Sequence, residues 1–383
     1  MDLRPSLRTR MADRGWLSPR LGLGLVAIAS LAGIVFFIDE SRGGKRIKSV
    51  TGPMVVDGEH GKLIENVHIT SSSGPCLVIK NSSNVTVRDS EIGPCGGNGI
   101  EVASSKNVRI VDSYVHPEFR VTGCCDKGNG IFAHLSSDIL IQGNVVAYGE
   151  SNVQLLGVKN VEVKGNFLLN PLGPFPRGQQ IQVWGRGGTR SANILVETNY
   201  TLASIASEYA FSDGQWDAIN LGYTDGAVVR NNYIQGGRSH SGCGLIADDS
   251  ANNMQFLDNT LVNTGQCGIG IASGTNQVVD GNRILNNGLT IPSVGNTAVY
   301  VWKQYSAPCG PVRISNNVAV MKRANGAFTS YWKGSGCDTT TLTNNTFDRA
   351  AEEILAPIEL TNPPPPIPPL EYSRKPATPF SGP

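Results

Sequence analysis

The chain has 383 residues, of which 40% are hydrophobic and 16% charged, and its formal net charge is +1. This balance gives no support for a general nucleic-acid-binding surface, so we expect no nucleic-acid partner. A chain of this length commonly folds into two or three domains, unless internal repeats stack into one long core.

The first 38 residues differ from the rest of the chain. Residues 1–20 are a basic segment with five arginines, and residues 21–38 are an uncharged run, LGLGLVAIASLAGIVFFI. About 17–20 apolar residues can span a bilayer, so we expect a transmembrane signal-anchor helix at 21–38. A cleaved signal peptide is the alternative, although Phe36, Phe37 and Ile38 at the end of the run make a poor cleavage site.

Basic residues stand on both sides of this run, so the positive-inside rule defines its orientation only weakly. Eight cysteines further along the chain favour an oxidising, translocated compartment. We therefore expect a single-pass membrane protein with its main domain in the periplasm or outside the cell, or a secreted protein if the helix is cleaved. Residues 39–54 would form a linker and an N-terminal cap.

Residues 55–348 contain about ten imperfect repeats. One repeat, GIEVASSKNVRIVDSYV at 99–115, has two short alternating strands separated by a polar turn and followed by a bend. Because alternation buries one side of a strand, the first strands predict inward pairs that recur every 22 to 38 residues. These pairs are Leu77/Ile79, Ile100/Val102, Ile131/Ala133, Val153/Leu155, Ile181/Val183, Ile219/Leu221, Leu245/Ala247, Ile269/Ile271 and Val299/Val301.

The bend of each repeat carries the sharper signal. After Ser90 and Ser113 in the first two repeats, asparagines hold the same place in the later ones: Asn144, Asn166, Asn199, Asn232, Asn259, Asn282, Asn317 and Asn345. Asparagine tolerates left-handed backbone angles and bonds to neighbouring backbone groups. Stacked about 4.8 Å apart, identical amides can also bond to one another along a column.

This repeat resembles the right-handed β-helix superfamily of pectate lyases and polygalacturonases, and VVDGEHGKLIENVHI at 55–69 is similar to the first coil of many members. The resemblance implies an all-β fold, a right-handed, single-stranded parallel β-helix (a solenoid) of about ten coils, after the N-terminal transmembrane helix. Residues 349–383 would add a C-terminal cap, helical at 349–356, and a proline-rich tail. Because one fold serves many functions, the resemblance does not define an activity.

The register of the coils also pairs cysteines. Two disulfides are predicted between adjacent coils: Cys243–Cys267 and Cys309–Cys337. The pairing of four further cysteines, in the loops of the first three coils, stays open: Cys76, Cys95, Cys124 and Cys125. A metal site is the alternative for the adjacent Cys124 and Cys125, although their spacing matches no familiar zinc pattern.

The resemblance implies that a polysaccharide lies along the outer face of the first strands. Aromatic side chains there would stack on sugar rings, and polar ones would bond to hydroxyl groups. The candidate substrate-binding residues are Trp184, Gln182, Asn220, Tyr223, Arg186, Arg238, Asp248, Tyr300 and Trp302. The alternative is that these side chains only cover a flat sheet beneath the loops.

Residues 214–244 are similar to the polygalacturonase stretch in which an acid pair precedes one strand and a glycine-flanked histidine precedes the next. The resemblance places Asp217 on the second acid and His240 on the histidine, while Trp216 replaces the first acid. The acidic motif of the preceding coil and the Arg-Lys motif of the following coil are missing. These departures weaken the prediction of hydrolysis by the polygalacturonase mechanism.

We predict Asp217 as catalytic acid or base, His240 as its partner and Asp213 as the second carboxylate. Asp248 lies on the adjacent coil but about five residues further along the strand direction, or ~16 Å, which is too far for a catalytic pair unless the loop folds back. A lyase would need a base, and a cation to neutralise the uronate carboxyl group. Ca²⁺ is therefore expected as a cofactor only if the protein is a lyase, and no metal ligands are predicted.

The predicted function is that of an extracytoplasmic, membrane-tethered, monomeric enzyme that modifies or cleaves an acidic glycan. It would be a glycoside hydrolase, a polysaccharide lyase or an epimerase. The alternative is a non-catalytic β-helix that binds glycan or forms a structural module of the cell envelope.

Overall fold

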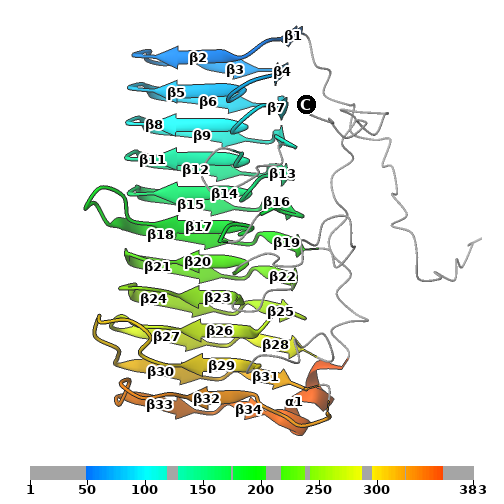
Figure 1. The fold of residues 1–383 in the computed structure, drawn as a ribbon, viewed down its shortest axis with the longest axis vertical. Helices are drawn as coiled ribbons and strands as arrows, with labels where there is room; N and C mark the ends of the chain where they lie inside the picture. The colour runs from blue at the N-terminus through cyan, green and yellow to red at the C-terminus, as the bar shows by residue number, and fades with distance from the viewer. Residues whose placement is uncertain are drawn as a thin grey trace, which may run out of the picture. The chain divides into compact units, whose positions relative to one another are not determined.

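The chain divides into two units, Met1–Ile38 and Asp39–Pro383, and every residue described here belongs to the second. The computed structural model (Figure 1) describes residues 49–118, 128–173, 176–203, 217–237, 242–286, 296–323 and 325–356. Three parallel sheets run through these residues, and each sheet takes every third strand of the chain. The sequence predicted two strands and a bend in each coil, whereas the residues that follow each bend pair into a third sheet.

The strands are assigned to sheets A, B and C as follows. Sheet A consists, within the described residues, of β1 (Ser49–Thr51), β4 (Val67–Ser71), β7 (Glu91–Cys95), β10 (Tyr114–Val115), β13 (Val145–Ala147), β16 (Phe167–Leu169), β19 (Tyr200–Ala203), β22 (Tyr233–Gly236), β25 (Thr260–Val262), β28 (Arg283–Asn286), β31 (Val318–Met321) and β34 (Thr346–Phe347). Sheet B consists of β2 (Met54–Asp57), β5 (Leu77–Lys80), β8 (Ile100–Ala103), β11 (Ile131–His134), β14 (Val153–Leu156), β17 (Ile181–Trp184), β20 (Ile219–Leu221), β23 (Cys243–Ala247), β26 (Cys267–Ile271), β29 (Thr297–Val301) and β32 (Tyr331–Lys333). Sheet C consists of β3 (Leu63–Glu65), β6 (Ser83–Arg88), β9 (Lys106–Val111), β12 (Ser137–Gln142), β15 (Lys159–Lys164), β18 (Ser191–Glu197), β21 (Thr224–Arg230), β24 (Asn252–Leu257), β27 (Gln277–Asp280), β30 (Val312–Ser315) and β33 (Thr340–Thr343).

The core lies inside the coils, between the three sheets. Every side chain of the nine inward pairs predicted for sheet B is fully buried. Their register is the predicted one: Ile131 pairs with Ile100 on one side and with Val153 on the other. Burial of these stacked aliphatic side chains removes apolar surface from water and supplies the main driving force for folding.

The asparagine column is confirmed. The backbone N–H and Nδ2 of Asn232 both donate to Oδ1 of Asn259, at 3.1 and 2.9 Å, and Nδ2 also donates to the carbonyl of Val196 at 3.0 Å. The left-handed turn belongs to the preceding residue, since Asn231 and not Asn232 has a positive φ, of 55°. The column residue therefore satisfies buried backbone groups while its neighbour makes the bend.

Both predicted disulfides are present, and a third one joins Cys76 to Cys95 within the first coils: Cys76–Cys95, Cys243–Cys267 and Cys309–Cys337. Cys124 and Cys125 lie outside the described residues. Disulfides are typical of proteins that fold in an oxidising compartment, which favours a location outside the cytoplasm.

A helix, α1 (Asp348–Leu355), follows the last strand. Its Ala351 and Leu355 pack against Val262, Leu285 and Val320 of sheet A. The helix therefore covers the side of the last coils (Figure 1). No helix within the described part of the chain is long and apolar enough to cross a membrane, and the anchor predicted at 21–38 lies outside that part.

Candidate active site on the outer face of sheet B

One row of side chains follows the outer face of sheet B from coil to coil. In spatial order it contains Gln154, Gln182, Asn220, Ile246, Gly270, Tyr300 and Trp332. The first part of this row is closed, because Gln154, Gln182 and Asn220 are at most 7% exposed. Their amides form part of a buried ladder, in which Nε2 of Gln154 donates to Oε1 of Gln182 at 2.8 Å.

Two predicted substrate-binding residues, Gln182 and Asn220, belong to this closed part of the row. Both are buried, and neither lines the pocket that opens further along the sheet. Hydrogen bonds such as the one between Gln154 and Gln182 stabilise the burial of these amides.

Two carboxyl groups meet at the end of this amide ladder. Nδ2 of Asn220 donates to Oδ2 of Asp217 at 2.7 Å and to Oδ2 of Asp248 at 2.8 Å. Because one nitrogen bonds both oxygens, these oxygens lie no further apart than the sum of the two lengths, about 5.5 Å. The separation of ~16 Å expected from the sequence is wrong, because it counted residues along straight strands and ignored the reach of side chains that converge on Asn220.

The second oxygen of each carboxyl group is also bonded. Oδ1 of Asp217 accepts the backbone N–H of Cys243 at 2.7 Å, and Oδ1 of Asp248 accepts the backbone N–H of Asp249 at 2.9 Å. The Asn220 amide nitrogen faces both carboxyl groups, whose Oδ2 atoms accept its hydrogen bonds. Oδ1 of Asn220 is buried without a hydrogen-bond partner among the described residues.

Burial controls the protonation of this pair. It raises the pKa of Asp217 to about 8, the nearby Asp248 carboxylate adds to the rise, and the hydrogen bonds from Cys243 and Asn220 oppose it. Burial also raises the pKa of Asp248, against hydrogen bonds with Asn220 and Tyr305. Asp217 is fully buried and is therefore mostly protonated at neutral pH.

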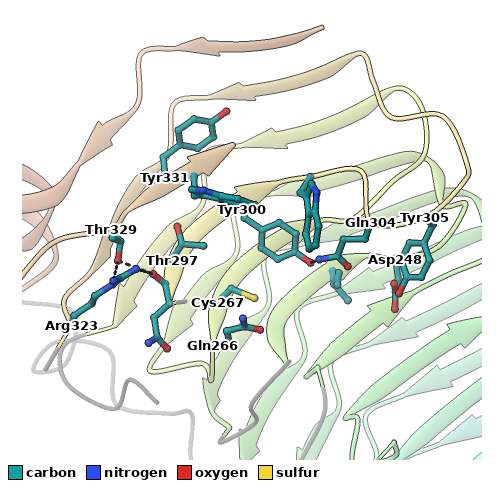
Figure 2. A pocket seen from close by; sticks show the side chains of 14 residues that line it. Asp248, Gln266, Cys267, Thr297, Tyr300, Gln304, Tyr305, Arg323, Thr329 and Tyr331 are labelled. Atoms are coloured by element: carbon teal, nitrogen blue, oxygen red, sulfur yellow. Dashed lines mark hydrogen bonds between the residues drawn. The ribbon is translucent and has the colours of Figure 1, made fainter. Parts of the chain in front are cut away.

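A pocket of about 480 Å³ opens beside Asp248. Figure 2 shows Asp248 and Tyr305 at one end of it, and Arg323 and Thr329 at the other. Five aromatic side chains contribute to the lining: Tyr300, Trp302, Tyr305, Tyr331 and Trp332. This volume and an aromatic wall with a few polar groups are typical of small-ligand sites, and such rings can stack on the apolar faces of sugars.

Glycine makes room for the central ring of the pocket. A Cβ atom on Gly270 would lie 2.5 Å from Cε1 of Tyr300, so the tyrosine ring lies directly over this glycine of the preceding coil. Nε2 of Gln304 donates to the Tyr300 hydroxyl at 3.3 Å. Burial raises the pKa of Tyr300 well above its usual value and also raises that of Tyr305, so both hydroxyl groups stay protonated near neutral pH.

Arg323 brings a positive charge to the far end of the pocket. Its Nε donates to Oγ1 of Thr329 at 3.2 Å, and Nη2 donates to the carbonyl of Asn296 at 3.4 Å. Within the described ranges the structure shows no acidic partner for this guanidinium group. The pocket thus pairs a carboxyl group at one end with a cation at the other.

Besides Gln182 and Asn220, three further predicted binding residues lie outside this pocket. Trp184 and Tyr223 have ring centroids 5.9 Å apart, and Arg186 lies 5.5 Å from the ring centroid of Phe132. All three come from the coils of β11 to β20, on the other side of Asp248 from the pocket. Of the predicted set, Asp248, Tyr300 and Trp302 line the pocket.

Three other predicted site residues, Asp213, Arg238 and His240, lie outside the described residues. The sequence reading missed Tyr305 and Arg323. Tyr305 follows Trp302 by three residues, so its place just after a first strand was a usable signal. Arg323 lies on the bend after β31, and no spacing in the sequence relates that bend to the face of sheet B.

Among the residues that the structure describes, no group of three or more His, Cys, Asp or Glu side chains is arranged to hold a metal ion.

Several solved structures show a distant similarity to the chain. The chain is similar to DFA-IIIase from Arthrobacter chlorophenolicus A6 in complex with GF2, at 18% identity over 65% of this chain and 53% of that one, with a TM-score of 0.40. It is also similar to the A-module of a mannuronan C-5 epimerase from Azotobacter vinelandii (12% identity, 78% of this chain, 86% of that one, TM-score 0.42). A third similar structure is a hyperthermoactive exopolygalacturonase from Thermotoga maritima (10% identity, 78% of this chain, 82% of that one, TM-score 0.45).

At these identities and TM-scores the likenesses carry no inference about activity, and the chain spans about half the length of the DFA-IIIase chain. No curated protein gives a match to this sequence. A family model described as the right-handed beta helix region matches residues 50–170 and 118–317, which is more than half of the chain. With its three parallel sheets and its column of asparagines, the chain belongs to this right-handed β-helix family.

Proposed function

We propose that the chain is a glycan-active enzyme in which Asp248 contacts the substrate, Asp217 is its carboxyl partner and the aromatic pocket holds the sugar. The observation that carries the proposal is the single Asn220 amide, which holds Oδ2 of Asp217 within about 5.5 Å of Oδ2 of Asp248, the member of the pair that lines the pocket. This upper limit is compatible with the ~5–5.5 Å between the carboxyl groups of glycosidases that retain anomeric configuration.

The protonation of the pair supports acid–base chemistry. With the pKa of Asp217 raised to about 8, the pair retains a proton at neutral pH, and Asp248 is the member that faces the pocket. Acid–base mechanisms that use neighbouring carboxyl groups need a member that carries a proton near neutral pH. Arg323 at the far end of the pocket favours an acidic sugar, and the disulfides favour a location outside the cytoplasm, with residues 21–38 as the proposed anchor.

The proposal is tested with the purified protein on a panel of neutral and uronic-acid polysaccharides, with and without Ca²⁺. New reducing ends without an unsaturated product indicate a hydrolase, an unsaturated product indicates a lyase, and altered uronate composition without cleavage indicates an epimerase. We expect Asp248→Asn to lower kcat/KM by at least ~100-fold, as loss of an acid–base group does. Asp249→Asn, which removes a neighbouring acid outside the pocket, is the matched control and should stay close to wild type.

A non-catalytic glycan-binding module is the second candidate. It is favoured by one observation, that Asp217 has no exposed surface and does not itself line the pocket. Binding of a polysaccharide with no chemical change to any member of the panel would support this candidate and contradict the enzyme.

A further inference from the structure

The surface on the N-terminal side of Asp248 carries an aromatic side chain that lies flat on the sheet. A Cβ atom on Gly222 would lie 2.0, 2.3 and 2.4 Å from Cζ3, Cε3 and Cη2 of Trp184, so the six-membered ring of the indole covers this glycine. Gly222 directly follows Leu221, which pairs with Ala247 in the next coil. Gly222 and Asp248 are therefore neighbours in adjacent coils, ~4.8 Å apart, and the indole lies beside the proposed catalytic carboxylate.

The pocket lies on the opposite side of Asp248. In the pocket, Tyr305 hydrogen-bonds to Asp248, and Tyr300 covers Gly270, two coils from the glycine under the indole. Trp302 follows in the same coil as Tyr300. Aromatic rings thus stand on both sides of Asp248 along the helix axis. In each case a glycine on the adjacent coil leaves the ring room to lie against the sheet.

The N-terminal surface has the chemistry of a sugar platform. Tyr223, whose ring is 5.9 Å from that of Trp184, is 42% exposed. The guanidinium of Arg190 lies 5.8 Å from the Tyr223 ring, and Nη2 of Arg190 donates to the carbonyl of Thr224, which holds the cation beside the aromatic pair. The half-buried Trp184 and the exposed Tyr223, next to a fixed cation, suit a sugar ring that carries an acidic group.

We propose that Trp184 and Tyr223 form a second glycan subsite, so that the substrate crosses Asp248 and is attacked inside the chain rather than at its end. This inference rests on the proposed function. A pocket alone would hold one end of a glycan, whereas platforms on both sides of the carboxylate bind the residues that flank an internal bond. The ligand class is an acidic oligosaccharide long enough to reach from the Trp302 side to Trp184.

The test uses the full-length protein with three variants at this surface. Trp184→Ala removes the platform, Gly222→Ala displaces the indole without removing it, and Trp184→Phe keeps an aromatic ring. We expect wild type to release oligomers of mixed length from a polymer at the earliest times. Trp184→Ala and Gly222→Ala should raise KM for long oligosaccharides roughly tenfold, as loss of a stacking ring does, with little change for the shortest substrate, and Trp184→Phe should restore most of the loss.

Early products that are only single terminal sugars, or equal effects of Trp184→Ala on long and short substrates, would overturn the inference while leaving the proposed function intact. Calorimetric binding of the same oligosaccharides is measured in parallel. If nothing is cleaved, the proposed enzyme activity fails, and binding alone decides the platform: a weaker affinity of Trp184→Ala for long oligosaccharides supports it, and an unchanged affinity rejects it.

Discussion

At the scale of single residues, the raised pKa of Asp217 makes the stability of the folded protein depend on pH. Its pKa rises from 3.8 to about 8 on folding, mainly because burial disfavours the charged form. Between these two pH values the unfolded chain has lost the proton that the folded chain keeps. The folded state therefore loses stability as the pH rises, at up to ~1.4 kcal/mol for each pH unit.

This linkage gives a prediction for Asp217→Asn. The variant cannot ionise at this position, so its free energy of unfolding should fall less steeply with pH than that of wild type between about pH 4 and pH 8. Denaturant titrations at several pH values measure the two slopes, and Asp249→Asn serves as the control with a wild-type slope. Parallel curves for wild type and Asp217→Asn would show that the carboxyl group ionises normally in the folded protein.

Single residues were also where sequence reading reached its limit. Asp248 could be singled out from its outward position in the repeat and Asp217 from the resemblance to polygalacturonases, and the pairing of Cys243 with Cys267 followed from the repeat register. That the Asp217 and Asp248 carboxyl groups meet at Asn220 could not be predicted, because this contact depends on side-chain rotamers and not on strand spacing. Counting residues along the strand direction estimates the distance between backbone positions, whereas the chemistry depends on the distance between carboxyl oxygens.

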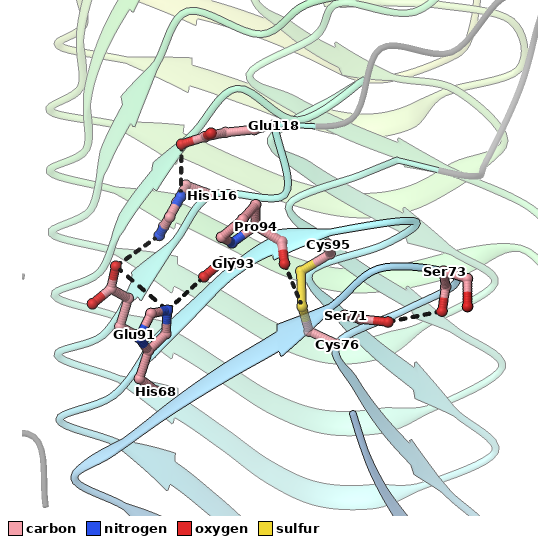
Figure 3. The surroundings of a disulfide bond; sticks show 10 residues. All are labelled: His68, Ser71, Ser73, Cys76, Glu91, Gly93, Pro94, Cys95, His116 and Glu118. Atoms are coloured by element: carbon pink, nitrogen blue, oxygen red, sulfur yellow. Dashed lines mark hydrogen bonds and ion pairs between the residues drawn. A yellow bond between two sulfur atoms is a disulfide. The ribbon is translucent and has the colours of Figure 1, made fainter. Parts of the chain in front are cut away.

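At the scale of elements, strands β7 and β10 hold a buried charge cluster on sheet A. Figure 3 shows His116 between two carboxylates, with Nε2 3.1 Å from Oε1 of Glu91 and Nδ1 2.8 Å from Oε1 of Glu118. Carboxylates only accept hydrogen bonds, so both ring nitrogens must carry hydrogen and the ring is cationic. Burial alone would lower the pKa of His116, but the bonds to Glu118 and Glu91 outweigh it and raise the pKa.

The raised pKa of His116 sets the sign of a second pH effect. Its contribution to stability is fully present below the unfolded pKa of about 6.5 and is lost as the pH rises through the folded value. We expect His116→Gln to be destabilising below about pH 6 and much less so at high pH. Thermal unfolding across this range measures the difference, and an NMR titration of His116 that gives an ordinary or lowered pKa would contradict the prediction.

Elements were predicted better than single contacts. The alternating first strands and their inward pairs are read directly from the sequence, since alternation marks burial on one side. The third sheet was not predicted from the sequence, because strands such as β10 and β34 are only two residues long and show no alternation of their own. These strands form because the asparagine column aligns the bends of neighbouring coils.

At the scale of the whole molecule, the fold is encoded many times over. Each coil repeats the same buried pair and the same bend, so an error in one repeat leaves the prediction of the solenoid intact. The functional face has no such redundancy. Asp248, Arg323 and Trp184 each occur once, in coils that differ from their neighbours at those positions, and only the stacking of the described coils brings them to one side of the molecule.

The central claim is that Asp248 marks the place where this β-helix binds and modifies a glycan. A crystal structure of Asp248→Asn with an acidic oligosaccharide tests it most directly. We expect one sugar in the pocket beneath Tyr300 and Trp302, the chain crossing position 248 within hydrogen-bond distance, ~3 Å, and a further sugar on Trp184. An oligosaccharide bound to sheet A or sheet C, with the pocket empty and position 248 out of reach, would contradict the account.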